Sequence, residues 1–143
     1  MQRYRKLIIA VLVFVLSMLC ITVFVGEAQE RQTRLAHSNG KGTLRVGDQQ
    51  FAISAAIVKL LPDGKAEITL LSDITVFLGA TWSNHAGSEH EFDLEITGGA
   101  SPGGLDGTGK VSLSDNSKSV KRLTLKGVSR TTKRAVEADF EGK

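Results

Sequence analysis

Cysteine is nearly absent from this chain of 143 residues, and its single copy, Cys20, lies in an apolar run near the N-terminus. The rest of the chain therefore has no thiol for nucleophilic catalysis and no pair of thiols for a disulfide. Apolar packing and backbone hydrogen bonds must stabilise the folded part without covalent cross-links.

Several motifs that identify enzymes and metalloproteins are also missing. The chain has no phosphate-binding loop with its lysine, no dinucleotide fingerprint and no zinc-protease helix. The glycine-rich segment 98–104 lacks the lysine and helix that follow in a phosphate cradle, so we expect a loop there. The one group of metal-type ligands, His85, Glu89, His90 and Glu91, lacks compact ligand spacing. We expect no enzymatic activity, no metal site and no cofactor.

The N-terminus is the most informative part of the sequence. Residues 7–25 form an uncharged, predominantly apolar run that follows Arg3, Arg5 and Lys6. This layout is typical of a secretory signal or an N-terminal membrane anchor, with the basic flank on the cytoplasmic side. We therefore expect the rest of the chain to be exported, to the periplasm or to the extracellular space.

Two fates of this segment fit the sequence. Gly26 and Ala28 supply the small residues that a signal peptidase requires, which predicts cleavage after Ala28 and a signal peptide over 1–28. The apolar run is long for a signal and long enough for a membrane helix. The alternative is thus an uncleaved anchor that associates with the membrane through residues 7–25.

The basic residues of the N-terminus account for the whole net charge. The chain has 18 basic and 15 acidic residues, and 15 of each remain without Arg3, Arg5 and Lys6. A neutral exported part gives no electrostatic argument for nucleic-acid binding, so we expect no nucleic-acid partner.

Apolar residues alternate with polar ones along most of residues 42–143, which predicts one all-β domain after a polar linker at 29–41. About eight short strands are indicated. The residues expected to face the core are Leu44, Val46; Phe51, Ile53, Ala55, Ile57; Ala66, Ile68, Leu70; Ile74, Val76, Leu78, Ala80, Trp82; Phe92, Leu94, Ile96; Leu105, Val111, Leu113; Leu123, Leu125; and Val136, Ala138, Phe140.

The links between these strands are short. The sequence Pro62-Asp63-Gly64 predicts a tight hairpin turn, and no interval has room for a crossover helix. Consecutive hairpins give an antiparallel meander, which hides its edges by closing into a small barrel or folding into a two-sheet sandwich. An exported meander of this length is similar in general plan to lipocalin-like carriers, a likeness that concerns architecture only.

Charged residues are unevenly distributed along the domain. Glu89, Glu91, Asp93 and Glu95 form an acidic ladder, whereas the segment 118–134 carries seven basic residues and no acid. We expect cross-strand pairing between the two, because pairing relieves the repulsion of like charges. The alternative is a basic surface that docks on anionic envelope material.

Small residues at core-facing positions are the remaining signal. Ala55, Ala80, Gly107 and Gly109, together with Ala66 and Gly127, leave room inside a barrel, and Trp82 lies at a strand end. The glycines equally fit a bend or a close approach of another backbone. The sequence favours a non-enzymatic binding protein for a small apolar or envelope-derived ligand, with Trp82, Ala55, Ala80, Gly107 and Gly109 at its site. The alternative is a tethered structural or adhesion module that acts through its outer surface.

Overall fold

The structure, a computed structural model, describes residues 32–99 and 104–143. The predicted signal peptide or anchor at 1–28 and the first residues of the predicted linker lie outside these ranges. Within them, no helix has the length and apolarity to cross a bilayer.

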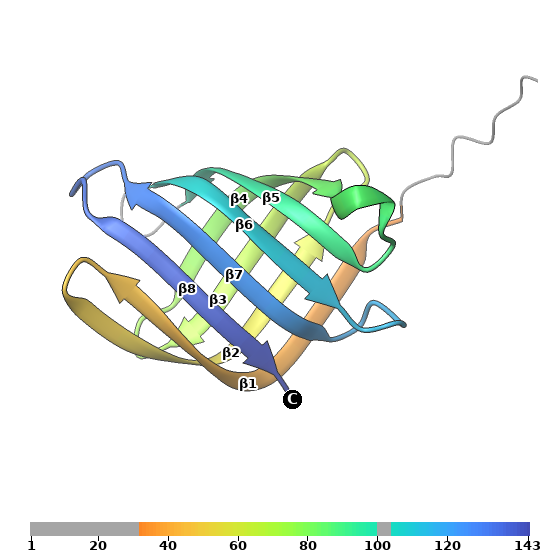
Figure 1. The fold of residues 1–143 in the computed structure, drawn as a ribbon, viewed down its shortest axis with the longest axis horizontal. Coiled ribbons are helices and arrows are strands. Elements are labelled where there is room, and N and C mark those ends of the chain that lie inside the picture. The colour runs from red at the N-terminus through yellow and green to blue at the C-terminus, as the bar shows by residue number, and fades with distance from the viewer. Residues whose placement is uncertain (1–31, 100–103) are drawn as a thin grey trace, which may run out of the picture. The chain divides into compact units, whose positions relative to one another are not determined.

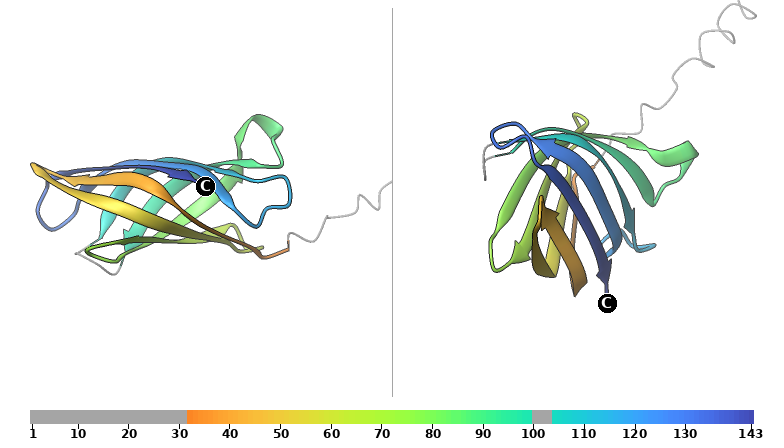
Figure 2. Two further views of the ribbon diagram at one scale, coloured as in Figure 1. Left: turned by 90° about the horizontal axis from the view of Figure 1, so that it is seen from below. Right: turned by 60° about the vertical axis from the view of Figure 1, so that its left-hand side comes forward.

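Eight antiparallel strands follow one another along the chain and close into a barrel (Figure 1). Every strand pairs with the next, and β1 pairs with β8, so the sheet curls back on itself (Figure 2). The predicted antiparallel meander is confirmed, and the barrel is the correct one of the two architectures. The elements are β1 (Arg34–Val46), β2 (Gln49–Leu60), β3 (Lys65–Ser72), β4 (Val76–Asn84), the 3-10 turn η1 (His85–Gly87), β5 (Glu91–Gly99), β6 (Leu105–Leu113), β7 (Val120–Ser129) and β8 (Ala135–Gly142).

Closure of the barrel is complete within residues 34–142. Each strand has a hydrogen-bonded neighbour on both sides, so no edge is left to pair with another chain. The core cluster also consists of residues from these strands. The barrel therefore contains its whole core and pairs all of its strand edges internally, as an independently folding domain requires.

The turn between β2 and β3 is the one that the sequence predicts. Gly64 has a φ of +86°, and its amide donates to the carbonyl of Leu61 at 3.1 Å. The Asp63 carboxylate accepts from the amide of Lys65 at 3.0 Å. The glycine supplies the positive φ, and the aspartate satisfies a backbone donor of the turn.

The first strand begins earlier than the sequence predicts. The expected linker at 29–41 is wrong from Arg34 onward, because β1 occupies Arg34–Val46. The core-facing positions of its first half are small residues, Ala36, Ser38 and Gly40, which show little apolar alternation. Gly40 is small for a steric reason: a Cβ there would clash with the carbonyl oxygen of Glu141 and would lie 2.7 Å from Cζ of Phe140 on β8. The aromatic ring supplies the bulk that β1 lacks.

A β-bulge in β2 overturns part of the predicted core. Ile53 pairs with Ser72 and Ala55 pairs with Leu71, so Ser54 is an extra residue in the ladder. After this bulge the residues of β2 that face the core are Ala56, Val58 and Leu60, which are all fully buried. Ala55 and Ile57 therefore do not face the core as predicted, although Ala55 is itself buried at the bulge.

The other predicted alternations are largely confirmed. Ile74 is an exception: it precedes β4 and is 38% exposed. Val46, Phe51 and Val136 are only partly buried, at the edge of the core. The confirmed core residues are Leu44, Ile53, Ala66, Ile68, Leu70, Val76, Leu78, Ala80, Trp82, Phe92, Leu94, Ile96, Leu105, Val111, Leu113, Leu123, Leu125, Ala138 and Phe140.

The predicted pairing of the acidic ladder with segment 118–134 is wrong, because β5 lies between β4 and β6. The basic side chains of β7 instead meet β8, where Arg122 contacts Asp139 at 3.1 Å and Lys126 contacts Glu137 at 4.0 Å. Within the ladder, Asp93 accepts from Nδ1 of His85, at 2.8 and 3.0 Å to its two oxygens. Strand order, which the charge pattern does not reveal, decides which charges meet.

Candidate functional site

The two ends of the barrel differ. We call the end at which β2, β4, β6 and β8 begin the open end, on the left of Figure 1, and the opposite end the closed end. Alternate hairpins of the meander lie at opposite ends, so each end is built from residues that are distant in the sequence.

Aromatic side chains fill the closed end. The rings of Trp82 and Phe92 pack edge to face, with centroids 5.4 Å apart and planes at 89°. Nε1 of Trp82 donates to the carbonyl of Leu61 at 2.9 Å, which ties the indole to the β2–β3 turn. The guanidinium of Arg34 covers the outer side of this pair, 5.3 Å from the Phe92 centroid, and donates to the carbonyl of Glu89 at 2.7 Å.

The open end holds an apolar cavity of about 200 Å³. No aromatic side chain of the described residues lines it, and its walls are aliphatic. The wall residues are Leu44, Val46, Leu70, Ile74, Val76, Leu78, Leu105, Leu125, Val136 and Ala138. Polar side chains occur at its rim, where Gln49, Ser129, Thr132 and Arg134 contribute to the lining. The cavity thus combines an apolar interior with a few polar groups at its mouth, as small-molecule sites commonly do.

One hydrogen bond between two hairpins and one within the β7–β8 hairpin fix the rim. The amide of Gly47 in the β1–β2 turn donates to the carbonyl of Ala135 at 2.9 Å. The amide of Ser129 donates to the carbonyl of Arg134, also at 2.9 Å. The backbone on both sides of Arg134 is therefore anchored, and the rim is defined before any ligand arrives.

Two arginines of the β7–β8 hairpin have different surroundings. Nε of Arg130 donates to the Asp106 carboxylate at 2.8 Å, and its guanidinium also donates to the carbonyl of Thr97. The hydrogen bond and the positive charge of Arg130 lower the pKa of Asp106, and Lys133 adds to this effect. Arg134, by contrast, has no hydrogen bond or ion pair through its guanidinium to any residue that the structure describes.

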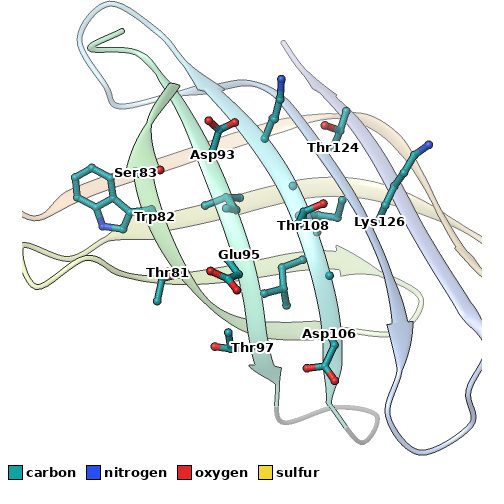
Figure 3. A pocket seen from close by; sticks show the side chains of 16 residues that line it. Thr81, Trp82, Ser83, Asp93, Glu95, Thr97, Asp106, Thr108, Thr124 and Lys126 are labelled. Atoms are coloured by element: carbon teal, nitrogen blue, oxygen red, sulfur yellow. The ribbon is translucent and has the colours of Figure 1, made fainter. Parts of the chain in front are cut away.

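A second hollow lies on the outside of the barrel, over β4 to β7 (Figure 3). It is an open groove of about 910 Å³. Its labelled side chains are mostly polar, and Asp93, Glu95, Asp106, Thr108 and Lys126 line it. Most of them are exposed to water, so the groove is an open surface that offers charge and hydroxyl groups, whereas the cavity at the open end is lined mainly by aliphatic side chains.

Three of the residues that the sequence singles out, Trp82, Gly107 and Gly109, contribute to the lining of the outer groove, whereas Ala55 and Ala80 do not. Trp82 packs at the closed end, and Ala55 shares the outer parity of Ile57 and Lys59 on β2. Ala80 is buried in the core between Ala66 and Ile96, its partners on the neighbouring strands.

The two glycines of the predicted site serve a close approach of strands. A Cβ on Gly107 would lie 2.6 Å from the Cα of Gly127, and one on Gly109 would lie 2.6 Å from the carbonyl oxygen of Thr124. The space that these side chains would need is therefore filled by β7: by its backbone at both glycines and also by the side chain of Leu125 at Gly109. None of the five predicted residues lines the interior cavity.

No group of three metal-type ligands is brought together within residues 32–99 and 104–143. Segment 99–103 has the residue pattern Gly-x-Ser-x-Gly, which in hydrolases forms a strand-to-helix elbow around the serine. Residues 100–103 of this pattern lie outside the described residues, and strand β6 begins at Leu105, where the elbow would continue as a helix.

Comparison with known proteins gives no family for this chain. Family models, curated proteins and solved structures were each searched, and none of them matches it.

Proposed function

We propose that the barrel is a non-enzymatic binding domain that takes the apolar part of a small molecule into its open end. The observation that supports this function is the aliphatic cavity, which lies at one end of a barrel whose other end is filled by Trp82 and Phe92. Burying apolar ligand surface there gains about 25 cal/mol for each Å² removed from water.

The size of the cavity limits the ligand. An engineered apolar cavity of about 150 Å³ stays dry and binds benzene. The cavity here, at about 200 Å³, is somewhat larger and has room for one short chain or one ring. With the export signal expected at residues 7–25, we propose that the domain meets such a ligand outside the cytoplasm, either released or anchored to the membrane.

The outer surface supports a second candidate, a tethered structural or adhesion module. The groove of Figure 3 is large, and Phe77 and Val128 on the outer face are 50% and 47% exposed. A partner that binds there would leave the interior cavity unused. The two candidates are therefore separated by a test of the cavity itself.

The test uses two matched alanines of the core, Ala138 on the cavity wall and Ala80 away from it. Leucine at position 138 places its extra carbons in the cavity, whereas leucine at position 80 only crowds a filled part of the core. Binding of n-octanol to residues 32–143 is followed by the NMR shifts of backbone amides. We expect Ala138→Leu to raise the Kd about tenfold or more and Ala80→Leu to change it less than about twofold.

Circular dichroism establishes that each variant is folded before the titration. Equal affinity in wild type and Ala138→Leu, with both folded, would show that octanol does not use the cavity. No saturable binding in wild type would leave the outer-surface module as the better function.

A further inference from the structure

We propose that the ligand is a single-chain amphiphile with a carboxylate head group, and that Arg134 at the cavity rim binds this head group. The inference deepens the proposed function and rests on it. Three features of the open end support it: the charge of the lining, the free state of Arg134 and the size of the cavity.

The lining carries charge of one sign. Arg134 is the one charged side chain among the described residues that line the cavity, and its neighbours at the rim are the neutral Gln49, Ser129 and Thr132. Asp48 and Asp73 occupy hairpins at this end, but neither contributes to the lining. A ligand whose tail is in the cavity therefore places its head group beside a positive charge.

Arg134 is free to bind an anion. Arg130 is already held by Asp106 and by the carbonyl of Thr97, and the electrostatic influence of Lys133 also reaches Asp106. The guanidinium of Arg134 makes no such contact within the described part of the chain. It presents a planar fork of donors, whose geometry matches the two oxygens of a carboxylate.

The stem of Arg134 is directed by the turn beside it. A Cβ on Gly47 would lie 3.0 Å from Cδ of Arg134, so the absence of a side chain at the β1–β2 turn makes room for the stem. Gly47 also has a φ of +59°, which favours glycine at this position. The anchored backbone and this neighbour place the exposed arginine at the rim of the cavity.

The cavity and the charge count together define the class of ligand. A volume of about 200 Å³ admits one short apolar tail but not the two chains of a bilayer lipid. One unpaired guanidinium neutralises one negative charge, which a carboxylate carries near neutral pH. A free short-chain carboxylate meets all of these conditions.

The experiment compares three probes of equal chain length, octanoate, n-octanol and octylamine, on residues 32–143 at low ionic strength. Each is titrated against wild type, Arg134→Gln and Lys133→Gln. Lys133 is the matched control, because it lies in the same hairpin and carries the same charge but does not line the cavity. The measured quantity is the ratio of the octanoate Kd to the octanol Kd, which cancels changes in the cavity itself.

We expect Arg134→Gln to raise this ratio about tenfold and Lys133→Gln to change it less than about twofold. Arg134→Lys should restore part of the effect, since it keeps the charge but loses the fork. Octylamine should bind wild type more weakly than octanol does. A ratio that is unchanged by Arg134→Gln, or an octylamine affinity above that of octanol, would overturn the inference.

Failure of the proposed function gives a different result. If octanol binds and only the ratio is insensitive to Arg134, the cavity is a binding site without a preference for carboxylates. If none of the three probes binds wild type, the proposed function and the inference both fall.

Discussion

At the scale of the residue, the core of this barrel depends on where side chains are missing as well as on where they are large. Gly107 lies opposite Gly127 in the β6–β7 ladder, at a core-facing position. The two backbones approach so closely there that no Cβ fits between them. Gly79 on β4 is different, because the nearest atom to its Cβ would be the carbonyl oxygen of Gly98, at 4.0 Å.

This contrast predicts opposite effects of the same substitution. Gly107→Ala forces β6 away from β7, and we expect it to lower the free energy of unfolding by roughly 1–3 kcal/mol. Gly79→Ala meets no obstacle and restricts the unfolded chain, so it should be neutral or should stabilise by up to about 1 kcal/mol. Urea denaturation followed by Trp82 fluorescence measures both. Similar losses in the two variants would contradict the packing that the structure shows around Gly107.

Single residues also show where prediction from the sequence succeeds and where it does not. Alternation identifies the core side of β5 correctly, because Phe92, Leu94 and Ile96 are large and their neighbours are charged. It fails beyond Ile53, because nothing in the run from Ala52 to Ala56 marks Ser54 as the extra residue of a bulge. A bulge is set by the ladders on both sides, and those partners are distant in the chain.

At the scale of the element, charge complementarity follows strand order. β7 carries basic residues on its outer face and β8 carries acidic ones, and the two strands are neighbours. Arg122 and Asp139 are 3.1 Å apart in this pair of strands. The acidic face of β5 has one basic residue opposite it on β6, Lys110 beside Asp93, and Glu95 pairs in register with Thr81 and Thr108.

The difference predicts which acid matters for stability. Asp139→Lys loses the contact with Arg122 and sets like charges side by side, so the variant should be less stable by about 1 kcal/mol at low salt. Glu95→Lys changes the net charge by the same amount, but its neighbours in register are two threonines, so it should lower the stability little. Thermal unfolding at low salt and in 1 M salt tests this. Concentrated salt screens surface charges, so it should reduce the difference in melting temperature between the two variants. A larger loss in Glu95→Lys would mean that the outer-face contacts of β5 differ from those described.

The first strand shows why an element can be missed altogether. The sequence predicts a linker over 29–41 because Ala36, Ser38 and Gly40 are small, and small residues give little hydrophobic signal. At Gly40 the size is dictated by β8, because a Cβ would clash with Phe140 and with the carbonyl oxygen of Glu141. The composition of one strand thus reflects the bulk of another strand far along the chain, a relation that local periodicity does not contain.

At the scale of the whole molecule, the sequence predicts the meander but does not choose between barrel and sandwich. The choice depends on β1 pairing with β8, from Gly40 opposite Gly142 to Val46 opposite Val136. The same closure separates the ends of the barrel and decides where the cavity lies. The candidate site was therefore not predictable: its wall combines residues from β1, β3, β4, β6, β7 and β8, and each of them reads individually as ordinary core.

The separation of the two ends predicts how ligand binding is reported. From the sequence, Trp82 is expected beside the ligand, so that its fluorescence would shift on binding. In the barrel its indole is held at the closed end by the carbonyl of Leu61 and the ring of Phe92. The cavity lies at the open end, where Leu70 and Leu78 form part of its wall.

We therefore expect saturating n-octanol to leave the emission maximum of Trp82 unchanged, while amide NMR shifts move around Val46, Val76 and Val136. Bound ligand should also raise the melting temperature, because it binds the folded state alone. The closed end needs no rearrangement for this, since ligand enters and leaves at the other end. A shift of the Trp82 emission with the same dependence on octanol concentration as the amide shifts would place the ligand deeper than the cavity described, or would show that the two ends are coupled.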